Sequence, residues 1–145
     1  MVGDFESDLD PLPAHILKTL HDHKRIIMAG FQQDVRPWLL AADAFVFPSY
    51  REGFPNSVLQ AACLELPVIA SDINGCNEII EPDKSGLLIP PKDTQALRIA
   101  MEGLATNSDK RRVYGINARE FVVRNFDQQF VWGELLKEYE SFSAK

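Results

Sequence analysis

The sequence predicts an α/β protein, a doubly wound parallel sheet followed by a helical tail. Its short apolar runs (Ile-Ile-Met, Phe-Val-Phe, Val-Ile-Ala and Leu-Leu-Ile) are apolar throughout and do not alternate with polar residues. Strands of this kind are covered on both faces, as in a parallel sheet with helices on either side. Amphipathic stretches separate the runs, and strand followed by helix, repeated, gives right-handed crossover units.

Five strands and seven helical segments are expected in order along the chain. The strands are expected at Met1–Gly3, Arg25–Ala29, Ala44–Phe47, Val68–Ser71 and Gly86–Ile89. The helices are expected at Leu12–His23, Val35–Ala42, Asn56–Leu64, Cys76–Ile80, Asp93–Thr106, Asp109–Val123 and Asp127–Ser141, the fourth being a single turn. Asp93 or Thr94, and Asp127, have the side chains of N-caps. No linker or repeat divides the chain, so residues 1–145 are expected to form one domain.

Composition excludes several classes of protein. The net charge of −6 argues against a nucleic-acid-binding surface, which needs clustered Lys and Arg. No apolar run approaches the ~20 residues that cross a bilayer, and Met1–Glu6 has neither the basic start nor the apolar core of a signal peptide. Cys63 and Cys76 have no metal-site spacing and are expected to be free thiols in a cytoplasmic protein, with Cys63 in the core.

The loop from Pro48 to Asn56 links an apolar strand to a helix. It carries Arg51 and Glu52 directly before Gly53, which permits a positive φ or close approach of a ligand. Asn56 is a suitable cap, and the helix after it offers unpaired N–H groups and a partial positive charge, which together form an anion site.

Gln60 lies one turn further along the same helix face and is aimed at the helix start. Taken residue by residue, the alternative is a solvated loop before an ordinary helix. The segment Ser71–Glu78 has a similar build, with Gly75 before a short helix, although Asn-Gly is first of all a turn signal.

The segment Phe47–Asp72 resembles the signature of the family 4 glycosyltransferases, whose fold is the two-domain GT-B type. It contains Pro-Ser, then Glu-Gly-Phe, the second position of the family's E-x₇-E motif, and Pro-Val followed by Ser-Asp. Asn74–Glu78 resembles the family's Gly-Gly-x-Pro-Glu, and Gly86–Pro91 resembles its next strand. The similarity runs from Met1 to about Tyr139, so the chain is similar to a Rossmann-like C-terminal, donor-binding domain.

This resemblance implies a retaining transferase of polysaccharide biosynthesis that uses a nucleoside-diphosphate sugar as substrate and no cofactor or metal. Glu52 would be catalytic, contacting the donor sugar hydroxyls. The segment Gly30–Asp34 would border the base, and Gln60 holds the ribose-binding position. The donor-binding residues implied are Arg51, Gly53, Phe54, Pro55, Asn56, Gln60, Phe31 and Asp34.

Two departures from the family pattern stand out. Position 60 is Gln where the family has an acid, which removes a charge-assisted hydrogen bond of roughly 1–2 kcal/mol.

The second departure is the absence of two parts of the family's fold. One is the first strand–helix unit, which carries an Arg and a Lys for the diphosphate, and the other is the N-terminal acceptor-binding domain. The chain is therefore expected to be truncated. The missing strand would lie between Met1–Gly3 and Ala44–Phe47, leaving both with unpaired edges. Asp4, Glu6, Asp8 and Asp10 would repel a diphosphate, leaving Arg51 and Arg36 as the nearby cations.

The chain alone is therefore expected to be inactive and to bind its donor poorly. A non-catalytic binding or assembly module, working with a separate acceptor-domain chain, is the alternative function. A dinucleotide-binding oxidoreductase domain is excluded, because this chain has no Gly-x-Gly-x-x-Gly motif after its first strand.

Three further segments have a structural interpretation. His21–His23 is interpreted as a solvated helix end rather than a metal site. Lys110–Arg112 is interpreted as a solvated face, with contact to acidic lipid at the inner face of the membrane as its alternative. A group of aromatic residues is expected to pin the last helices to the sheet, some rings staying exposed: Phe121, Phe126, Phe130, Trp132 and Tyr139.

Overall fold

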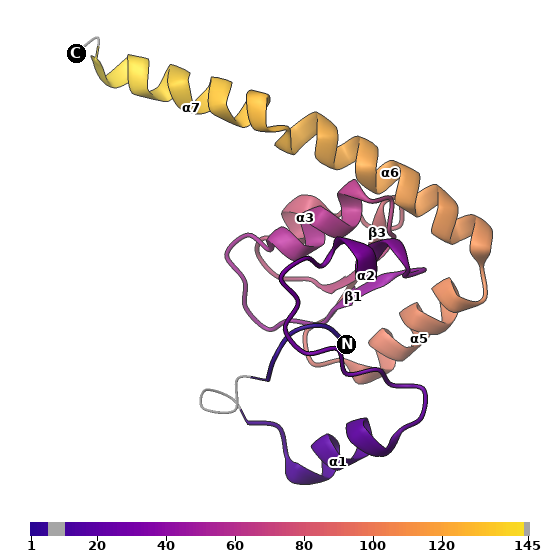
Figure 1. Ribbon diagram of the computed structural model, residues 1–145. Coiled ribbons are helices and arrows are strands. Elements are labelled where there is room, and N and C mark those ends of the chain that lie inside the picture. The colour runs from indigo at the N-terminus through magenta and orange to yellow at the C-terminus, as the bar shows by residue number, and fades with distance from the viewer. Residues whose placement is uncertain (6–10, 144–145) are drawn as a thin grey trace. The chain divides into compact units, whose positions relative to one another are not determined.

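The computed structural model describes residues 1–5 and 11–143, and it divides into two compact units, Met1–Leu40 and Ala41–Lys145 (Figure 1). Glu6, Asp8 and Asp10, which were expected to repel a diphosphate, lie outside the described residues. In the described part of the chain, no helix is both long enough and apolar enough to cross a membrane.

The first unit contains helices α1, Ala14–Asp22, and α2, Arg36–Leu40. The strands predicted at Met1–Gly3 and Arg25–Ala29 do not form as regular strands, so that prediction was wrong. The two segments are nevertheless hydrogen-bonded side by side. The Met1 amino group donates to the Ile27 carbonyl at 2.6 Å, and the Ala29 N–H donates to the Met1 carbonyl at 2.9 Å.

Two glycines explain why this pairing does not continue as a sheet. Gly3 and Gly30 have φ angles of +112° and +63°, and the Gly3 N–H donates to the Gly30 carbonyl at 2.8 Å. A positive φ turns the chain out of the extended conformation that a strand requires. The apolar pattern therefore identified the pairing segments, whereas the glycines ended them after two or three residues.

The second unit is built on a three-stranded parallel sheet, which confirms the predicted fold class. Its strands are β1, Phe45–Phe47, β2, Val68–Ser71, and β3, Gly86–Ile89, in the order β1-β2-β3. Every residue of β2 is buried, as the continuous apolar run predicts for a central strand. Within this sheet β1 is an edge strand and is only half-buried.

Five helices complete the second unit. They are α3, Asn56–Cys63, α4, Cys76–Ile79, α5, Thr94–Ala105, α6, Ser108–Phe126, and α7, Gln128–Ser143. Three of them begin at a capping side chain that accepts a backbone N–H. Asp93 accepts from Ala96 at 2.8 Å and Asp127 from Gln129 at 2.9 Å, which confirms both predicted caps. The α6 cap is Asn107, so that helix begins one residue earlier than predicted.

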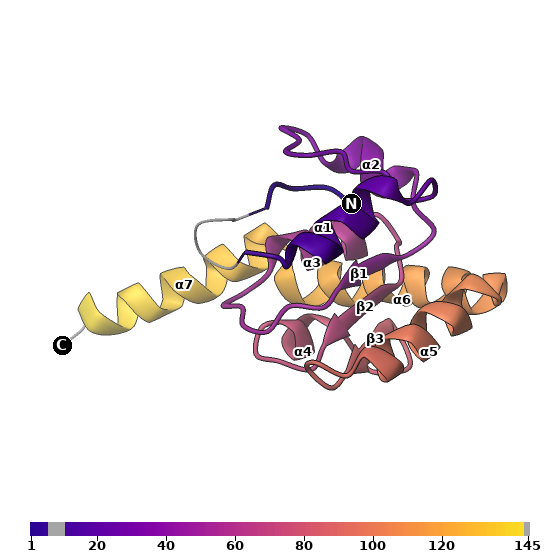
Figure 2. The same ribbon diagram turned by 90° about the horizontal axis from the view of Figure 1, so that it is seen from below.

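Helices cover both faces of the sheet (Figures 1 and 2). On one face Ala100 and Leu104 of α5 pack with Ile69, Ile89 and Tyr114 in a buried cluster. On the other face α3 contacts β1 and β2 and lies against α6. This arrangement leaves the loops after each strand together at the carboxyl edge of the sheet, where ligands bind in folds of this class.

The contact between α3 and α6 depends on one glycine. The turn after α3 holds Glu65 at a φ of +60°, and a methyl group on Gly115 of α6 would overlap the Glu65 carbonyl. Arg119, one turn further along α6, donates to the Cys63 carbonyl and lies 3.8 Å from the Glu65 carboxylate. The C-terminal end of α3 is therefore fixed against α6 by backbone contact.

The predicted role of the aromatic residues is only partly correct. Phe121 and Phe126 are half-buried and contact each other with ring centroids 6.2 Å apart. In contrast α7 continues beyond α6, away from the sheet (Figures 1 and 2), and none of its residues from 128 to 142 is buried. Phe130 and Trp132 are 52% and 59% exposed and do not pin α7 to the sheet.

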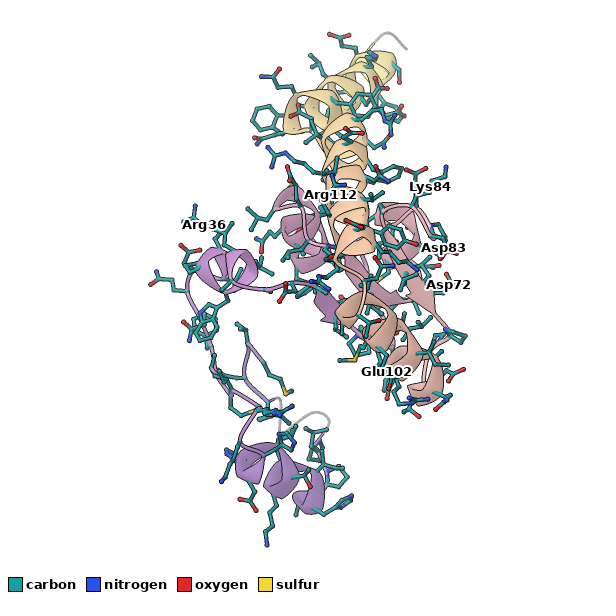
Figure 3. The ribbon with its side chains drawn as sticks, turned by 90° about the vertical axis from the view of Figure 1, so that its right-hand side faces the viewer. Arg36, Asp72, Asp83, Lys84, Glu102 and Arg112 are labelled. Carbon is teal, nitrogen blue, oxygen red and sulfur yellow. The ribbon has the colours of Figure 1, made fainter. Side chains whose placement is uncertain are left out.

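The prediction that Lys110–Arg112 forms a solvated face is also only partly correct. The Lys110 ammonium lies 5.0 Å from the centroid of the Tyr114 ring, and the Arg111 guanidinium donates to the Leu104 carbonyl at 2.6 Å. Only Arg112 is exposed on the outside of α6 (Figure 3).

We predict that Gly115→Ala destabilises the chain by about 1–3 kcal/mol, because the added methyl group must push α3 and α6 apart. Chemical unfolding, followed by circular dichroism, measures the change. Gly103→Ala in α5 is the matched control, since its Cβ would meet no atom within 4 Å. There the helix propensity of alanine should raise stability by up to about 1 kcal/mol. Equal effects of the two substitutions would contradict the assignment of Gly115 to a close helix contact.

Candidate functional site

Glu52 lies in the loop that follows β1, and a neighbouring hydroxyl fixes its carboxylate. The Ser49 hydroxyl donates to Glu52 Oε1 at 2.7 Å. Both residues are half-buried, so the carboxylate is only partly solvated. A hydrogen bond to an ionised acceptor is among the stronger ones in proteins and restricts the side chain to one orientation.

The helix that follows begins one residue earlier than a capping role for Asn56 would require. Pro55 is the N-cap of α3, no side chain caps the helix, and Asn56 is its first residue, so the predicted cap was wrong. Pro55 fits there because it has no N–H that needs a partner. The first-turn N–H groups of α3 therefore have no capping side chain in front of them, which suits an incoming anion.

Gly53 precedes this helix start with ordinary backbone geometry. It has no positive φ, and a Cβ there would meet no atom within 4 Å. Of the two uses that the sequence allowed for this glycine, only close approach of a ligand fits the structure. Phe54, the next residue, packs its ring against Phe126 of α6 with centroids 5.2 Å apart.

Gly75 joins this loop to the one that follows β2. Its φ is +81°, and a Cβ at this position would overlap the Gly53 carbonyl and lie 2.9 Å from Pro55 Cδ. Only glycine satisfies both conditions. The sequence had marked Asn74-Gly75 as a turn, but its second role is to let the two loops pack backbone to backbone.

Side chains close the β2 loop on itself. The Gly75 N–H donates to Glu78 Oε1 at 3.2 Å, and the Asn77 amide donates to Asp72 Oδ1 at 3.1 Å. The Asp72 N–H donates to the Ile89 carbonyl at 2.8 Å, which ties the loop to β3. The acids at 72 and 78 therefore hold the loop in place.

The two loops enclose a shallow pocket of about 300 Å³, called here the Glu52 pocket, lined by Tyr50, Arg51, Glu52, Ile73 and Asn74. Its lining combines a carboxylate, an amide, a guanidinium and an aromatic ring, groups that suit a polar small molecule. Its volume is at the lower end of the range for small-molecule sites.

A second pocket, of about 360 Å³, lies at the other end of β1. It is lined by Asp43, Ala44, Val46, Ile69, Met101, Leu104, Ala105 and Arg111. Asp43 and Ala44 precede β1, so this pocket opens at the amino end of the strand, whereas ligands in such sheets bind at the carboxyl end. The Glu52 pocket is therefore the better candidate site despite its smaller volume.

Cys76, the first residue of α4, is fully buried, and Cys63 is half-buried. The core cysteine is therefore Cys76 rather than Cys63, contrary to the prediction. Burial, and secondarily the negative charge of Glu52, raise the pKa of the Cys76 thiol to about 11. A thiolate beside this carboxylate is thus strongly disfavoured, and the thiol stays protonated at neutral pH.

The remaining predicted site residues are distributed as follows. Gln60 is exposed on α3, one turn beyond Asn56. Phe31 and Asp34 belong to the first unit. The Phe31 ring is 72% exposed, and its N–H donates to the Asp4 carboxylate at 2.9 Å. Asp4 therefore has a structural partner.

Asp34 accepts two hydrogen bonds from the Arg36 guanidinium, at 2.8 and 2.9 Å, on the surface of the first unit. These bonds lower the pKa of the Asp34 carboxyl and raise that of Arg36. Arg36, labelled in Figure 3, is thus already engaged with a carboxylate in place of the diphosphate role considered for it. Among the described residues, no group of three or more His, Cys, Asp or Glu side chains is placed to hold a metal ion.

Three residues of the site were missed by the sequence reasoning. Ser49 was noted only as part of a Pro-Ser pair, although its spacing of three from Glu52 permits the hydrogen bond. Tyr50 was not assigned a role. Lys92, after β3, places its ammonium 5.3 Å from the Tyr50 ring centroid, a contact between distant positions that no local pattern signals.

Residues 1–107 match the family described as glycosyl transferases group 1. The chain belongs to this family. It is 33% identical over 100 residues to the capsular polysaccharide biosynthesis glycosyltransferase CapM of Staphylococcus aureus, covering 69% of this chain and 26% of CapM. The chain thus spans about a quarter of that relative's length.

Solved structures of glycosyltransferases share its fold. Anabaena HepE superposes with a TM-score of 0.84 over 97% of this chain and 40% of its own, at 23% identity, and was solved with UDP, with UDP and glucose, and with UDP-glucose. Sucrose-phosphate synthase from Thermosynechococcus elongatus superposes with a TM-score of 0.82 over 90% of this chain and 34% of its own, at 29% identity. The chain therefore has the fold that was predicted for it, that of the C-terminal domain of a GT-B glycosyltransferase.

We predict that the stability of the chain falls as the pH rises from about 9 toward 11, through the pKa of Cys76. The folded thiol keeps its proton in a range where the unfolded thiol, with its pKa near 9.0, has lost it. The stabilisation is complete below pH 9 and is lost toward pH 11. Urea unfolding at a series of pH values measures it. Cys76→Ala should flatten this part of the profile and Cys63→Ala should leave it unchanged; the reverse result would contradict the assignment.

Proposed function

We propose that this chain is the donor-binding part of a retaining glycosyltransferase that uses a nucleoside-diphosphate sugar. The observation that carries the proposal is the Glu52 carboxylate, which Ser49 holds in the lining of the Glu52 pocket, in the loop that leads to the start of α3. A fixed hydrogen-bond acceptor beside an uncapped helix N-terminus suits a ligand with hydroxyls at one end and phosphates at the other.

In this proposal each end of the donor has its own partners. Glu52 accepts hydrogen bonds from the sugar hydroxyls and holds the anomeric carbon toward the acceptor. The N–H groups of Gly53, Phe54 and Asn56 receive the diphosphate, while Pro55 sets the helix start. Arg51 adds a positive charge at the pocket rim. Preorganised donors at the departing diphosphate stabilise the transition state by several kcal/mol in comparable sites.

The nucleoside end is assigned to Gln60 of the second unit. Gln60 would accept from a ribose hydroxyl through its carbonyl oxygen and donate through its amide. The assignment of Phe31 and Asp34, which belong to the first unit, stays a prediction from the resemblance.

Retention is assigned to a front-face displacement. The acceptor oxygen forms its bond to the anomeric carbon on the face from which the phosphate oxygen leaves, and the acceptor proton passes to the departing diphosphate. The donor is thus a substrate, and no cofactor or metal is part of the proposal. We assign the product to polysaccharide biosynthesis because CapM, by its name, acts there.

The acceptor is expected to bind to polypeptide beyond these 145 residues. The chain corresponds to 26% of CapM and 40% of HepE, and its exposed α7 offers an apolar surface for further polypeptide. We therefore propose that the isolated chain transfers no sugar and binds donor weakly. A cytoplasmic location, where nucleotide sugars are available, and contact with a membrane only through the complete enzyme belong to the same proposal.

A second candidate is a non-catalytic nucleotide-sugar-binding or assembly module. The side chains of residues 128–142 in α7 favour it, because none of them is buried and the helix therefore has capacity for a partner chain. The two functions differ in what Glu52 does. In the transferase Glu52→Gln abolishes turnover by the complete assembly, whereas in the module turnover is unchanged.

We predict weak binding of nucleotide sugars that depends on Glu52. Saturation-transfer NMR with UDP-glucose, UDP-galactose, UDP-glucuronate and GDP-mannose detects ligands of millimolar affinity. Glu52→Gln should weaken binding of the preferred nucleotide sugar about tenfold, the size of one charge-assisted hydrogen bond, and leave the free nucleoside diphosphate within about twofold. Glu120→Gln, an exposed glutamate of α6, is the matched control and should bind as the wild type does.

Absence of binding by every nucleotide sugar in this series would overturn the proposed function. Tight binding, or measurable sugar transfer by the isolated chain, would overturn the proposal that the remaining polypeptide is required.

A further inference from the structure

Tyr50 belongs to the lining of two pockets at the carboxyl edge of the sheet. It is 63% exposed and lines the Glu52 pocket. It also lines a pocket of about 170 Å³, called here the Lys92 pocket, whose remaining lining is Pro48, Ser71, Ile89, Lys92, Asp93, Thr94 and Leu97. The two pockets share Tyr50 and no other residue.

Lys92 supports the ring from the side of the Lys92 pocket. Its ammonium lies 5.3 Å from the ring centroid, within the range of a cation–π contact. Lys92 is part of the lining of the Lys92 pocket and not of the Glu52 pocket. A cation over one face of a ring leaves the opposite face available to a ligand.

The backbone directs Lys92 to this position. Its φ is +66°, a conformation that residues other than glycine seldom adopt. The Asp93 N–H donates to the Pro90 carbonyl at 3.2 Å, and the Asp93 side chain caps α5. The turn between β3 and α5 is thus closed on both sides of Lys92. Unfavourable φ values persist where the surrounding structure determines them, and such positions are concentrated at functional sites.

The lining of the Glu52 pocket matches the two kinds of surface on a hexose ring. Hydroxyls around the ring edge need acceptors and donors, which Glu52, Asn74 and Arg51 provide. The ring's C–H face is apolar and needs a flat apolar partner, which an aromatic side chain provides with little conformational entropy to lose. A phosphate would use the carboxylate poorly, because the two negative charges repel each other.

We propose that the Tyr50 ring binds the apolar face of the donor hexose, and that Lys92 is a positioning residue that holds this ring. The inference rests on the proposed function and extends it, because it assigns the sugar to the space between Tyr50 and Glu52. Tyr50 then contributes to binding of the sugar and not to binding of the nucleoside diphosphate. Lys92 acts through Tyr50 and touches no ligand.

The test compares a nucleotide sugar with its nucleotide in four variants, using titrations of UDP-glucose and UDP followed by NMR. Tyr50→Ala should weaken UDP-glucose binding about tenfold while UDP stays within twofold. Tyr50→Phe keeps the ring and should retain wild-type affinity. Lys92→Met keeps the stem but removes the charge, and should weaken UDP-glucose a few-fold with UDP unchanged. Lys110→Met is the matched control, since its ammonium lies 5.0 Å from the Tyr114 ring, remote in sequence from both loops.

The outcomes separate this inference from the function on which it rests. Equal loss of UDP and UDP-glucose in Tyr50→Ala, or no loss of either, would overturn the role of Tyr50 and leave donor binding intact. Failure of the wild type to bind any nucleotide sugar would overturn the proposed function itself. Methyl α-glucopyranoside distinguishes the donor sugar from an acceptor sugar: displacement of the glycoside by UDP-glucose supports the donor assignment, whereas simultaneous binding of both at Tyr50 overturns it.

Discussion

The close approach of Gly75 to the Gly53 carbonyl is the constraint on which the candidate site depends. It joins the loop after β1, which carries Glu52, to the loop after β2, which carries Asn74. No side chain fits between the two backbones, and the φ of +81° at Gly75 independently requires glycine. The distance across the Glu52 pocket is therefore set by main-chain packing, which is less adaptable than a contact between flexible side chains.

A similar contact fixes the other end of α3. There the Glu65 carbonyl lies against Gly115 of α6, as the Gly53 carbonyl lies against Gly75 near the helix start. The helix that would present its N–H groups to a diphosphate is thus held at both ends by a carbonyl packed on a glycine. Because preorganised donors need no rearrangement when charge develops on the leaving group, such rigidity suits a transferase in which charge stabilisation is the main task. In the same unit α7, with its exposed apolar side chains, remains available for further polypeptide.

The sequence was sufficient where the information is local. Continuous apolar runs identified all three strands of the second unit, and Asp93 and Asp127 identified two helix starts. It failed where geometry decides: Gly3 and Gly30 end the pairing of Met1–Gly3, and Pro55 rather than Asn56 caps α3. The support of Tyr50 by Lys92 joins loops about forty residues apart, so no spacing rule reveals it. The site loop itself was identified by its resemblance to a family, because Arg-Glu-Gly alone is common in solvated turns.

Mapping a donor onto the amide resonances of the chain tests the central claim most directly, that the two packed loops and the start of α3 form the donor site. We predict that UDP-glucose shifts the amides of residues 50–54, 56–57 and 73–76, and that Gly75→Ala, which separates the loops, removes these shifts while the resonances of α5 and β3 still indicate a folded sheet. Shifts concentrated instead around Asp43 and Arg111, or shifts at the loops that survive Gly75→Ala unchanged, would contradict the account.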